Sequence, residues 1–262
     1  PEYLVPQSAV YESSRFLDEY LLFHYATEEQ MFASGELSLV PHYGEAMRSG
    51  YGFPQRTVSH FSPHWMERGL DIGCAVGRST FEMAKTCQQV TGIDFSRSFI
   101  RHAQALQRGD SIEYTRLDEG QRVTSLLAEV PQDCPREGVF FEQGDAMDLR
   151  AELRDFDRVH AANVLCRLSH PLALLQRLPQ LVKPGGELVL ATPCSWLQEF
   201  TFPENWPQPD TFAWLQQQLQ GDFILLSATH EPFLIRESAR KFQWTFSQVS
   251  VWRRRDDAMR QS

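Results

Sequence analysis

Cysteine is scarce in this 262-residue sequence, and none of its five cysteines belongs to a Cys-x-x-Cys pair. The odd count and wide spacing disfavour a disulfide framework and a zinc site, so we expect a reducing compartment, by default the cytoplasm. Long apolar runs are also missing: segments such as 188–191 and 223–228 are far too short to cross a bilayer. No basic segment followed by an apolar one opens the chain as a secretory signal would. We therefore expect no membrane partner.

Positive charge is in short supply, with 25 Lys and Arg against 34 Asp and Glu and a formal net charge of -9. This balance repels phosphate backbones, so we expect no nucleic acid partner. No metal is expected either, because Pro63 lies between His60 and His64 and disfavours the helix that would pair them. The sequence opens at Pro1 without a methionine, which is typical of a trimmed chain or of a piece of a longer polypeptide.

Strand-like and helix-like segments alternate along most of the chain. Strands are expected at 70–73, 89–94, 139–143, 156–162 and 187–192, and two closing strands at 223–227 and 242–251. Helices are expected from Arg78, after a cap at Ser96, from Pro171 and over 211–220. The alternation predicts an α/β fold with a doubly wound, seven-stranded, mostly parallel sheet of Rossmann-like type.

The domain organisation is expected to have two parts. Residues 1–66 form an N-terminal helical or lid extension, with a helix over 11–33 followed by a loop that holds at most one short helix. Residues 67–262 form the main domain. Two insertions are expected in it: 109–137, which carries a hairpin around 112–117, and 193–210, a flap rich in proline and aromatic residues.

The most informative segment is 70–79, where a strand ends in Asp-Ile-Gly and a helix follows Gly77. Gly73 and Gly77 let the backbone approach a ligand where a Cβ would collide, and the helix that follows offers free N–H groups. Asp94 ends the next strand, where a carboxylate can accept both hydroxyls of a ribose. Together these features predict an adenosine-containing ligand. The third glycine of the dinucleotide fingerprint and the Gly-Lys of a P-loop are absent.

Four segments, in order, resemble the S-adenosylmethionine site of class I methyltransferases: 71–77, Asp94, 144–146 and the Lys-Pro-Gly-Gly of 183–186. The resemblance implies S-adenosylmethionine as cofactor, S-adenosylhomocysteine as product, and no metal. It also implies that Asp145 bonds the adenine amino group between Ala146 and Met147, and that Asp71 orders the turn near the methionine ammonium. The cofactor-binding residues that it implies are Asp71, Gly73, Cys74, Gly77, Asp94, Phe95, Gly144, Asp145, Ala146 and Asn163.

A narrower resemblance covers nearly the whole chain. Residues 11–13, 20–25, 141–146, 162–168 and 181–186, and most specifically 195–201, 232–237 and 239–244, are similar to the 5-thiohistidine N-methyltransferases of ovothiol biosynthesis. This implies methyl transfer to the imidazole Nπ (N1) of 5-thiohistidine, giving ovothiol A, and fusion or association with a 5-histidylcysteine sulfoxide synthase. The chain departs from the family pattern at 207–209, where Leu-Gly-Gly is expected, and at Ser238, where His is expected.

Methyl transfer to a ring nitrogen needs an apolar pocket and in-line alignment more than a strong base. Asn163 ends the fourth strand, where it contacts the imidazole or simply forms a turn. An arginine near the closing strands suits the substrate carboxylate, although such a charge run is otherwise solvated. His24 is expected to be a core histidine. The catalytic candidates are Asn163, Tyr25 and Tyr11, and the substrate-binding candidates are Arg236, Arg240, Lys241, Trp196 and Trp244.

Two alternatives stay open. The first is a methyltransferase of another small molecule, such as histidine or a thiol, which turnover on histidine and 5-thiohistidine would separate. The second is a non-catalytic methyltransferase-like module that positions a partner enzyme, which a cofactor titration would separate. The intact acids and glycines of the cofactor pattern argue against a decayed site.

Overall fold

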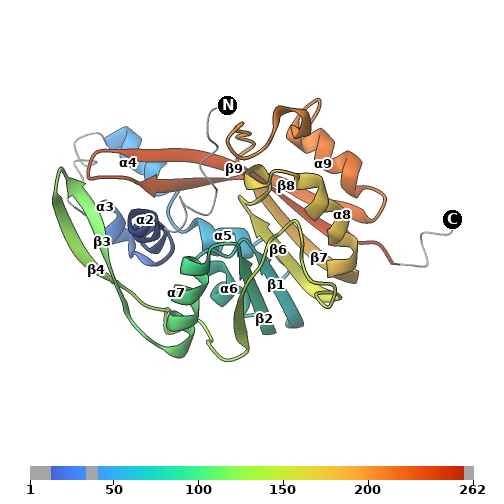
Figure 1. Cartoon of the computed structure of the whole chain (residues 1–262), viewed down its shortest axis with the longest axis horizontal. Helices are drawn as coiled ribbons and strands as arrows, with labels where there is room; N and C mark the ends of the chain where they lie inside the picture. Colours follow the sequence, from blue (N-terminus) through green and yellow to red (C-terminus); the bar gives the residue numbers. More distant parts are fainter. Residues whose placement is uncertain (1–12, 34–40, 257–262) are drawn as a thin grey trace.

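The computed structural model describes residues 13–33 and 41–256, and its centre is a seven-stranded sheet (Figure 1). The strand order is β5-β2-β1-β6-β7-β9-β8, with the first five strands parallel and β9 antiparallel to both of its neighbours. The expected fold class is therefore confirmed. The strands are β1 (Met66–Ile72), β2 (Cys87–Asp94), β5 (Val139–Gln143), β6 (Phe156–Ala162), β7 (Val182–Thr192), β8 (Phe223–Arg236) and β9 (Phe242–Arg254).

The order in which successive strands are added to the sheet reverses between β5 and β6. Strands β1, β2 and β5 are added on one side, and the chain then returns to place β6 on the other side of β1. At such a switch point the loops at the carboxyl ends of the strands separate and leave a crevice for a ligand. The sheet topology thus places the candidate site at the carboxyl ends of β1, β2 and β6.

Helices cover the sheet over two apolar clusters, one of which contains Phe81 and Phe99 and the other Leu174 and Leu178. The Ser96 side chain accepts a hydrogen bond from Phe99 N, which confirms the expected helix cap. The helices of this part are α6 (Arg78–Met83), α7 (Arg97–Arg108), α8 (Pro171–Leu181) and α9 (Thr211–Leu219), with short 3-10 turns η2 (Leu165–Arg167) and η3 (Pro203–Asn205). Within the described ranges, no helix is long and apolar enough to cross a membrane.

The N-terminal segment differs from the single helix expected over 11–33. It forms α2 (Ser14–Tyr25) and α3 (Glu28–Phe32), because Thr27 caps the second helix in a reciprocal capping box with Gln30. Residues 11 and 12 lie outside the described residues. Two further helices, α4 (Pro41–Arg48) and α5 (Phe53–Val58), follow where at most one was expected. Leu21 and Phe53 belong to the same apolar cluster as Phe81 of the main domain.

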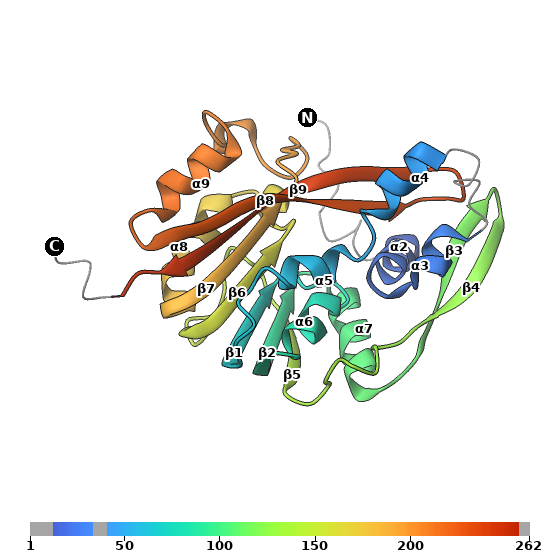
Figure 2. The ribbon, with the colours of Figure 1, turned by 180° about the vertical axis from the view of Figure 1, so that it is seen from behind.

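The last two strands are much longer than expected. Only the second half of β9 pairs with β7, through residues 248–253, so the distal halves of β8 and β9 pair with each other beyond the sheet. In both views this hairpin reaches the N-terminal helices (Figures 1 and 2). Arg56 of α5 bonds Glu231 of β8 at 2.8 Å, and His60 bonds the same carboxylate at 2.8 Å. The hairpin therefore connects the N-terminal helical segment to the C-terminal strands at the carboxyl edge of the sheet.

The first expected insertion is a separate two-stranded sheet, β3 (Ile112–Glu119) and β4 (Arg122–Ala128), so a hairpin at this place is confirmed. The Lys-Pro-Gly-Gly segment differs from the tight turn expected before the fifth strand. It lies inside β7, where the register with β6 shifts after Val182 and Gly185 adopts a φ of +75°.

Candidate active site

The bend between β1 and α6, residues 73–77, has a backbone that favours glycine at two positions. Gly73 has a φ of +73° and Gly77 a φ of +90°. A Cβ at Gly73 would lie 3.1 Å from Val164, and one at Gly77 would lie 2.6 Å from the Phe141 ring. Gly73 lines the candidate cavity, whereas Gly77 does not. Gly77 is therefore required by packing against Phe141, whereas Gly73 is the glycine of the bend whose backbone lines the cavity.

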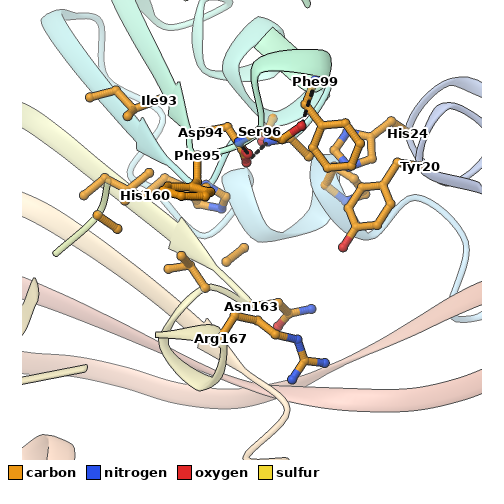
Figure 3. A pocket seen from close by; sticks show the side chains of 18 of the residues that line it. Tyr20, His24, Ile93, Asp94, Phe95, Ser96, Phe99, His160, Asn163 and Arg167 are labelled. Atoms are coloured by element: carbon orange, nitrogen blue, oxygen red, sulfur yellow. Dashed lines mark hydrogen bonds between the residues drawn. The ribbon is translucent and has the colours of Figure 1, made fainter. Parts of the chain in front are cut away.

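Asp94 ties the first two strand ends together. Its Oδ2 accepts a hydrogen bond from Ala75 N at 2.9 Å, and its Oδ1 accepts one from Ser96 N at 2.8 Å (Figure 3). The side chain lines the cavity. Since each carboxylate oxygen can accept more than one hydrogen bond, Asp94 can hold the bend and a pair of ribose hydroxyls at once.

Asp71 lies behind the bend, buried, and does not line the cavity. Its Oδ2 accepts hydrogen bonds from Ser79 Oγ and Thr80 Oγ1, both at 2.7 Å. Its Oδ1 lies 2.7 Å from His160 Nδ1, and His160 Nε2 lies 3.0 Å from Thr57 Oγ1. Burial alone would raise the pKa of Asp71, but His160 and the two hydroxyls outweigh it and hold the pKa below its usual value. Asp71 therefore orders the start of α6, as expected, and also links it to α5.

The cavity of about 290 Å³ runs along the carboxyl ends of β5, β2, β1 and β6. At the β5 end, Asp145 Oδ1 accepts a hydrogen bond from Met147 N at 2.8 Å, which fixes the loop that the adenine is expected to contact. The expected cofactor-binding residues that line the cavity are Gly73, Asp94, Phe95, Gly144, Asp145, Ala146 and Asn163.

Asn163 and Arg167 line the other side of the cavity, on the loop after β6 (Figure 3). Asn163 has a φ of 57°, and its Oδ1 accepts a hydrogen bond from Ser247 Oγ at 2.6 Å, which leaves its amide nitrogen as the donor for a ligand. The Arg167 guanidinium lies 4.5 Å above the ring of Phe200, in the flap. Sequence reasoning did not single out Arg167, although a cation four residues after the strand-end Asn163 was a usable signal.

The N-terminal helices and the hairpin complete the wall of the cavity. Their contributions are mostly aromatic or aliphatic, from Tyr20, Phe23, Phe53, Phe233 and Ile235. Phe53 and Phe233 pack with ring centroids 5.1 Å apart. The cavity therefore has polar groups at the strand ends and mostly apolar side chains on the opposite wall.

Several expected site residues lie behind the cavity rather than on it. Cys74 and Tyr25 are buried, and the Tyr25 hydroxyl donates to Val76 O at 2.7 Å. Burial raises the pKa of Tyr25 well above its usual range. Trp196 packs against Trp214 and donates its indole N–H to Thr211 Oγ1 at 2.9 Å. The structure thus gives Tyr25 a role in holding the bend, which differs from the expected catalytic role. Tyr11 lies outside the described residues.

The expected substrate cations also lie away from the cavity, at the far end of the hairpin. Arg236 is buried, and its Nη1 donates to Met31 O and Ala33 O, both at 2.8 Å. Lys241 is exposed and bonds Glu237, Arg240 is exposed, and Trp244 is 43% exposed. Short closing strands would have placed these residues at the sheet edge, but the long hairpin carries them beyond it. Arg167 is the arginine that lines the cavity instead.

The fold and the site together define a class. A sheet of this order, with a glycine bend after β1, an acid ending β2 and a Gly-Asp after β5, is the fold of class I S-adenosylmethionine-dependent methyltransferases. The chain matches the methyltransferase-domain family over residues 40–248 and belongs to that family.

Known proteins agree with this family. The chain is 29% identical to a tRNA U34 carboxymethyltransferase of Idiomarina loihiensis, over 53% of this chain and 36% of that protein. It is 28% identical to an O-methyltransferase of Aspergillus sclerotiorum, over 58% of this chain and 46% of that protein. The chain thus spans less than half the length of these curated relatives. A solved SAM-dependent methyltransferase of Methanosarcina mazei shares the fold, with a TM-score of 0.50 and 18% identity over 75% of this chain and 95% of that one.

Across residues 13–33 and 41–256, no group of three or more His, Cys, Asp or Glu side chains is placed to hold a metal ion.

Proposed function

We propose that the chain transfers the methyl group of S-adenosylmethionine to a small-molecule acceptor. The observation that carries this proposal is the contact of Asp94 with Ala75 N, which joins the ribose-type acid to the glycine bend inside one cavity. The residues fit the cofactor: Gly73 brings backbone to the cavity, Asp94 offers acceptors for ribose, and Asp145 lies at the β5 end, where the adenine is expected. When bound, the cofactor supplies an electrophilic methyl group on a sulfonium.

The chain's own residues would then orient the acceptor and exclude water. The aromatic cover from α2, α5 and β8 lowers the polarity around the reacting groups, and this favours a reaction in which positive charge leaves sulfur. Asn163, held by Ser247, presents a fixed amide donor beside the acceptor. Rigid placement of the acceptor nitrogen can supply most of the rate enhancement.

The finer proposal is that the acceptor is 5-thiohistidine, methylated at the imidazole Nπ to give ovothiol A. The segments 195–201, 232–237 and 239–244, which resemble the 5-thiohistidine N-methyltransferases, support it. Arg167 supports it as well, because a guanidinium at the acceptor side of the cavity suits the carboxylate of an amino acid. Association with a sulfoxide synthase that supplies the thiohistidine precursor is part of the same proposal.

The deciding experiment incubates the protein with S-adenosylmethionine and 5-thiohistidine and analyses the products by mass spectrometry. We expect a mass gain of one methylene unit, located on the imidazole by fragmentation. Histidine, a simple thiol and a phenol serve as competing acceptors, the last because one curated relative is an O-methyltransferase. Methylation of another acceptor alone would reject 5-thiohistidine, and the absence of cofactor binding would reject the methyltransferase activity itself.

Replacing Arg167 by alanine is expected to raise KM for an acceptor that bears a carboxylate by about 10- to 100-fold, the loss of one hydrogen bond to a charged group. Arg167→Lys should recover only part of this, because an ammonium cannot make the bidentate contact. Steady-state kinetics measure KM, and calorimetry with S-adenosylhomocysteine should show an unchanged Kd.

Arg68→Ala is the matched control for this prediction. Arg68 also lies over an aromatic ring, 4.4 Å from the centroid of Phe156. It belongs to the N-terminal half of β1, at the end of the sheet away from the cavity. Equal effects of the two substitutions on KM would contradict a role for Arg167 in acceptor binding.

A further inference from the structure

His24 has an unsatisfied nitrogen at the cavity. The side chain is 7% exposed and lines the cavity from α2, and its Nδ1 has no hydrogen-bond partner among the described residues. The ring is fixed by its neighbours: it stacks on Tyr20 with centroids 5.9 Å apart and meets the edge of Phe23 at 5.3 Å. A buried polar atom normally has a partner, so a rigid, unpartnered nitrogen at a cavity wall indicates a ligand contact. This differs from the core histidine expected from the sequence.

The position of α2 shows which part of a ligand His24 would meet. The neighbouring Tyr25 donates its hydroxyl to Val76 O in the glycine bend, so the end of α2 rests on that bend. Gly73 and Ala75 of the bend and Ser79 of α6 line the same cavity as His24. His24 and the bend after β1 therefore border one cavity, and Figure 3 shows His24 beside Tyr20 on the α2 side of it.

The strand order then sets the direction of the cofactor. Asp145 follows β5 and Asp94 ends β2, and β2 lies between β5 and β1 in the sheet. An adenosyl ligand with its adenine at Asp145 and its ribose at Asp94 extends toward the bend after β1. The group that reaches His24 is thus the amino-acid end of the ligand, which carries an α-ammonium and an α-carboxylate.

The protonation state of His24 distinguishes these two groups. Burial lowers the pKa of His24 to about 3, with a smaller raising by Asp71 and a smaller lowering by Arg78, so the ring is neutral and offers a lone pair at neutral pH. Both of these neighbours are already paired, Asp71 with His160, Ser79 and Thr80, and Arg78 with Glu82. A lone pair accepts a hydrogen bond from an ammonium, whereas an ionised carboxylate has no proton to donate to it.

We infer that His24 is a cofactor-binding residue whose Nδ1 accepts a hydrogen bond from the α-ammonium of S-adenosylmethionine. The inference rests on the proposed function, since it requires this cofactor. The product S-adenosylhomocysteine carries the same ammonium, so His24 binds the cofactor equally before and after methyl transfer. Such uniform binding changes Kd and the cofactor KM and leaves kcat nearly unchanged.

The test uses His24→Leu and three ligands in calorimetry. S-Adenosylhomocysteine carries the amino-acid end, 5′-methylthioadenosine lacks it, and decarboxylated S-adenosylmethionine keeps the ammonium but lacks the carboxylate. We expect Kd to rise about tenfold or more for the first and third ligands, and by less than about twofold for 5′-methylthioadenosine. His24→Asn keeps a side-chain acceptor and should recover part of the affinity.

Phe23→Leu is the matched control, because it alters the same aromatic cover without removing a polar atom. It should affect the three ligands equally. Equal effects of His24→Leu on S-adenosylhomocysteine and 5′-methylthioadenosine would overturn the inference, as would no effect on either. A loss for S-adenosylhomocysteine without a loss for the decarboxylated ligand would place the contact on the carboxylate and overturn the ammonium assignment.

The proposed function and the role of His24 can be rejected separately. A wild-type protein that binds none of the three ligands rejects the proposed function and the inference with it. A wild-type protein that binds S-adenosylhomocysteine while the His24 variants discriminate no ligand rejects the inference alone. If His24→Leu does not fold by circular dichroism, His24→Asn carries the test, and discrimination between the same ligands is again the expected result.

Discussion

Asp94→Ala is expected to weaken S-adenosylmethionine binding by about 100-fold or more, roughly 3 kcal/mol. The substitution removes the acceptors for the ribose hydroxyls and also the oxygens that hold Ala75 N and Ser96 N. The bend and the start of α7 then lose their common anchor, so the binding surface is disordered as well as depleted. Calorimetric titration of the purified variant measures the change in Kd.

Asp110→Ala is the control for net charge, since Asp110 is an exposed acid just beyond the far end of α7. Its Kd should equal that of the wild type. Asp94→Asn keeps the shape and one acceptor oxygen and should fall between the wild type and the alanine variant. An unchanged Kd in Asp94→Ala would mean that the ribose binds elsewhere.

Asp71→Asn is expected to lower the free energy of unfolding by about 3–5 kcal/mol at neutral pH, the usual effect of removing one partner from a buried charged network. The amide cannot accept from His160, Ser79 and Thr80 as the carboxylate does. Because Asp71 orders the bend and α6, cofactor binding should weaken too. Urea denaturation followed by circular dichroism measures the first effect, and calorimetry the second.

The difference in the free energy of unfolding between wild type and Asp71→Asn should decrease as the pH falls. The pKa of Asp71 is lowered below 3.8 in the folded protein, so its stabilising contribution is complete above about pH 4 and is lost as the pH falls through the folded value. The gap between wild type and Asp71→Asn should therefore shrink in acid. A gap that stays constant down to the acid transition would contradict an ionised Asp71.

Asp157→Asn is the comparison that separates stability from binding. Asp157 is also buried, and its carboxylate accepts a hydrogen bond from Arg68 N at 2.9 Å. It lies at the N-terminal end of β6, away from the cavity. It should lower the free energy of unfolding while leaving the cofactor Kd of the folded protein unchanged. If Asp71→Asn behaves in the same way, Asp71 stabilises the fold without preparing the cofactor site.

The cofactor half of the site could be predicted from the sequence because its signals are local. The strands β5 and β6 and the start of α8 match their expected bounds, and Pro171 marks the start of the helix. Gly73, Asp94 and Asp145 each follow or end such a strand, and parallel strands bring their carboxyl ends to one edge.

The rest of the cavity wall could not be predicted because it depends on long-range contacts. No local pattern marks that β8 continues through Pro232 to Arg236, because proline is tolerated in edge strands and only the order of the sheet shows that β8 is one. The break before α3 depends on Thr27, a cap with neither glycine nor proline beside it. Without these two features, the sequence could not bring His24, Phe233 and Arg167 to one cavity.

The contact between Arg56 and Glu231 joins residues 175 positions apart in the chain. Because a ribosome makes the chain from its N-terminus, the early helices leave the exit tunnel long before the strand that pairs with them exists. During that interval the rings of Phe23 and Phe53 lack the β8 residue Phe233 that packs on them in the finished protein. Contacts of such sequence separation form late in folding, so the newly made protein completes the wall of the cavity only when its last two strands are in place.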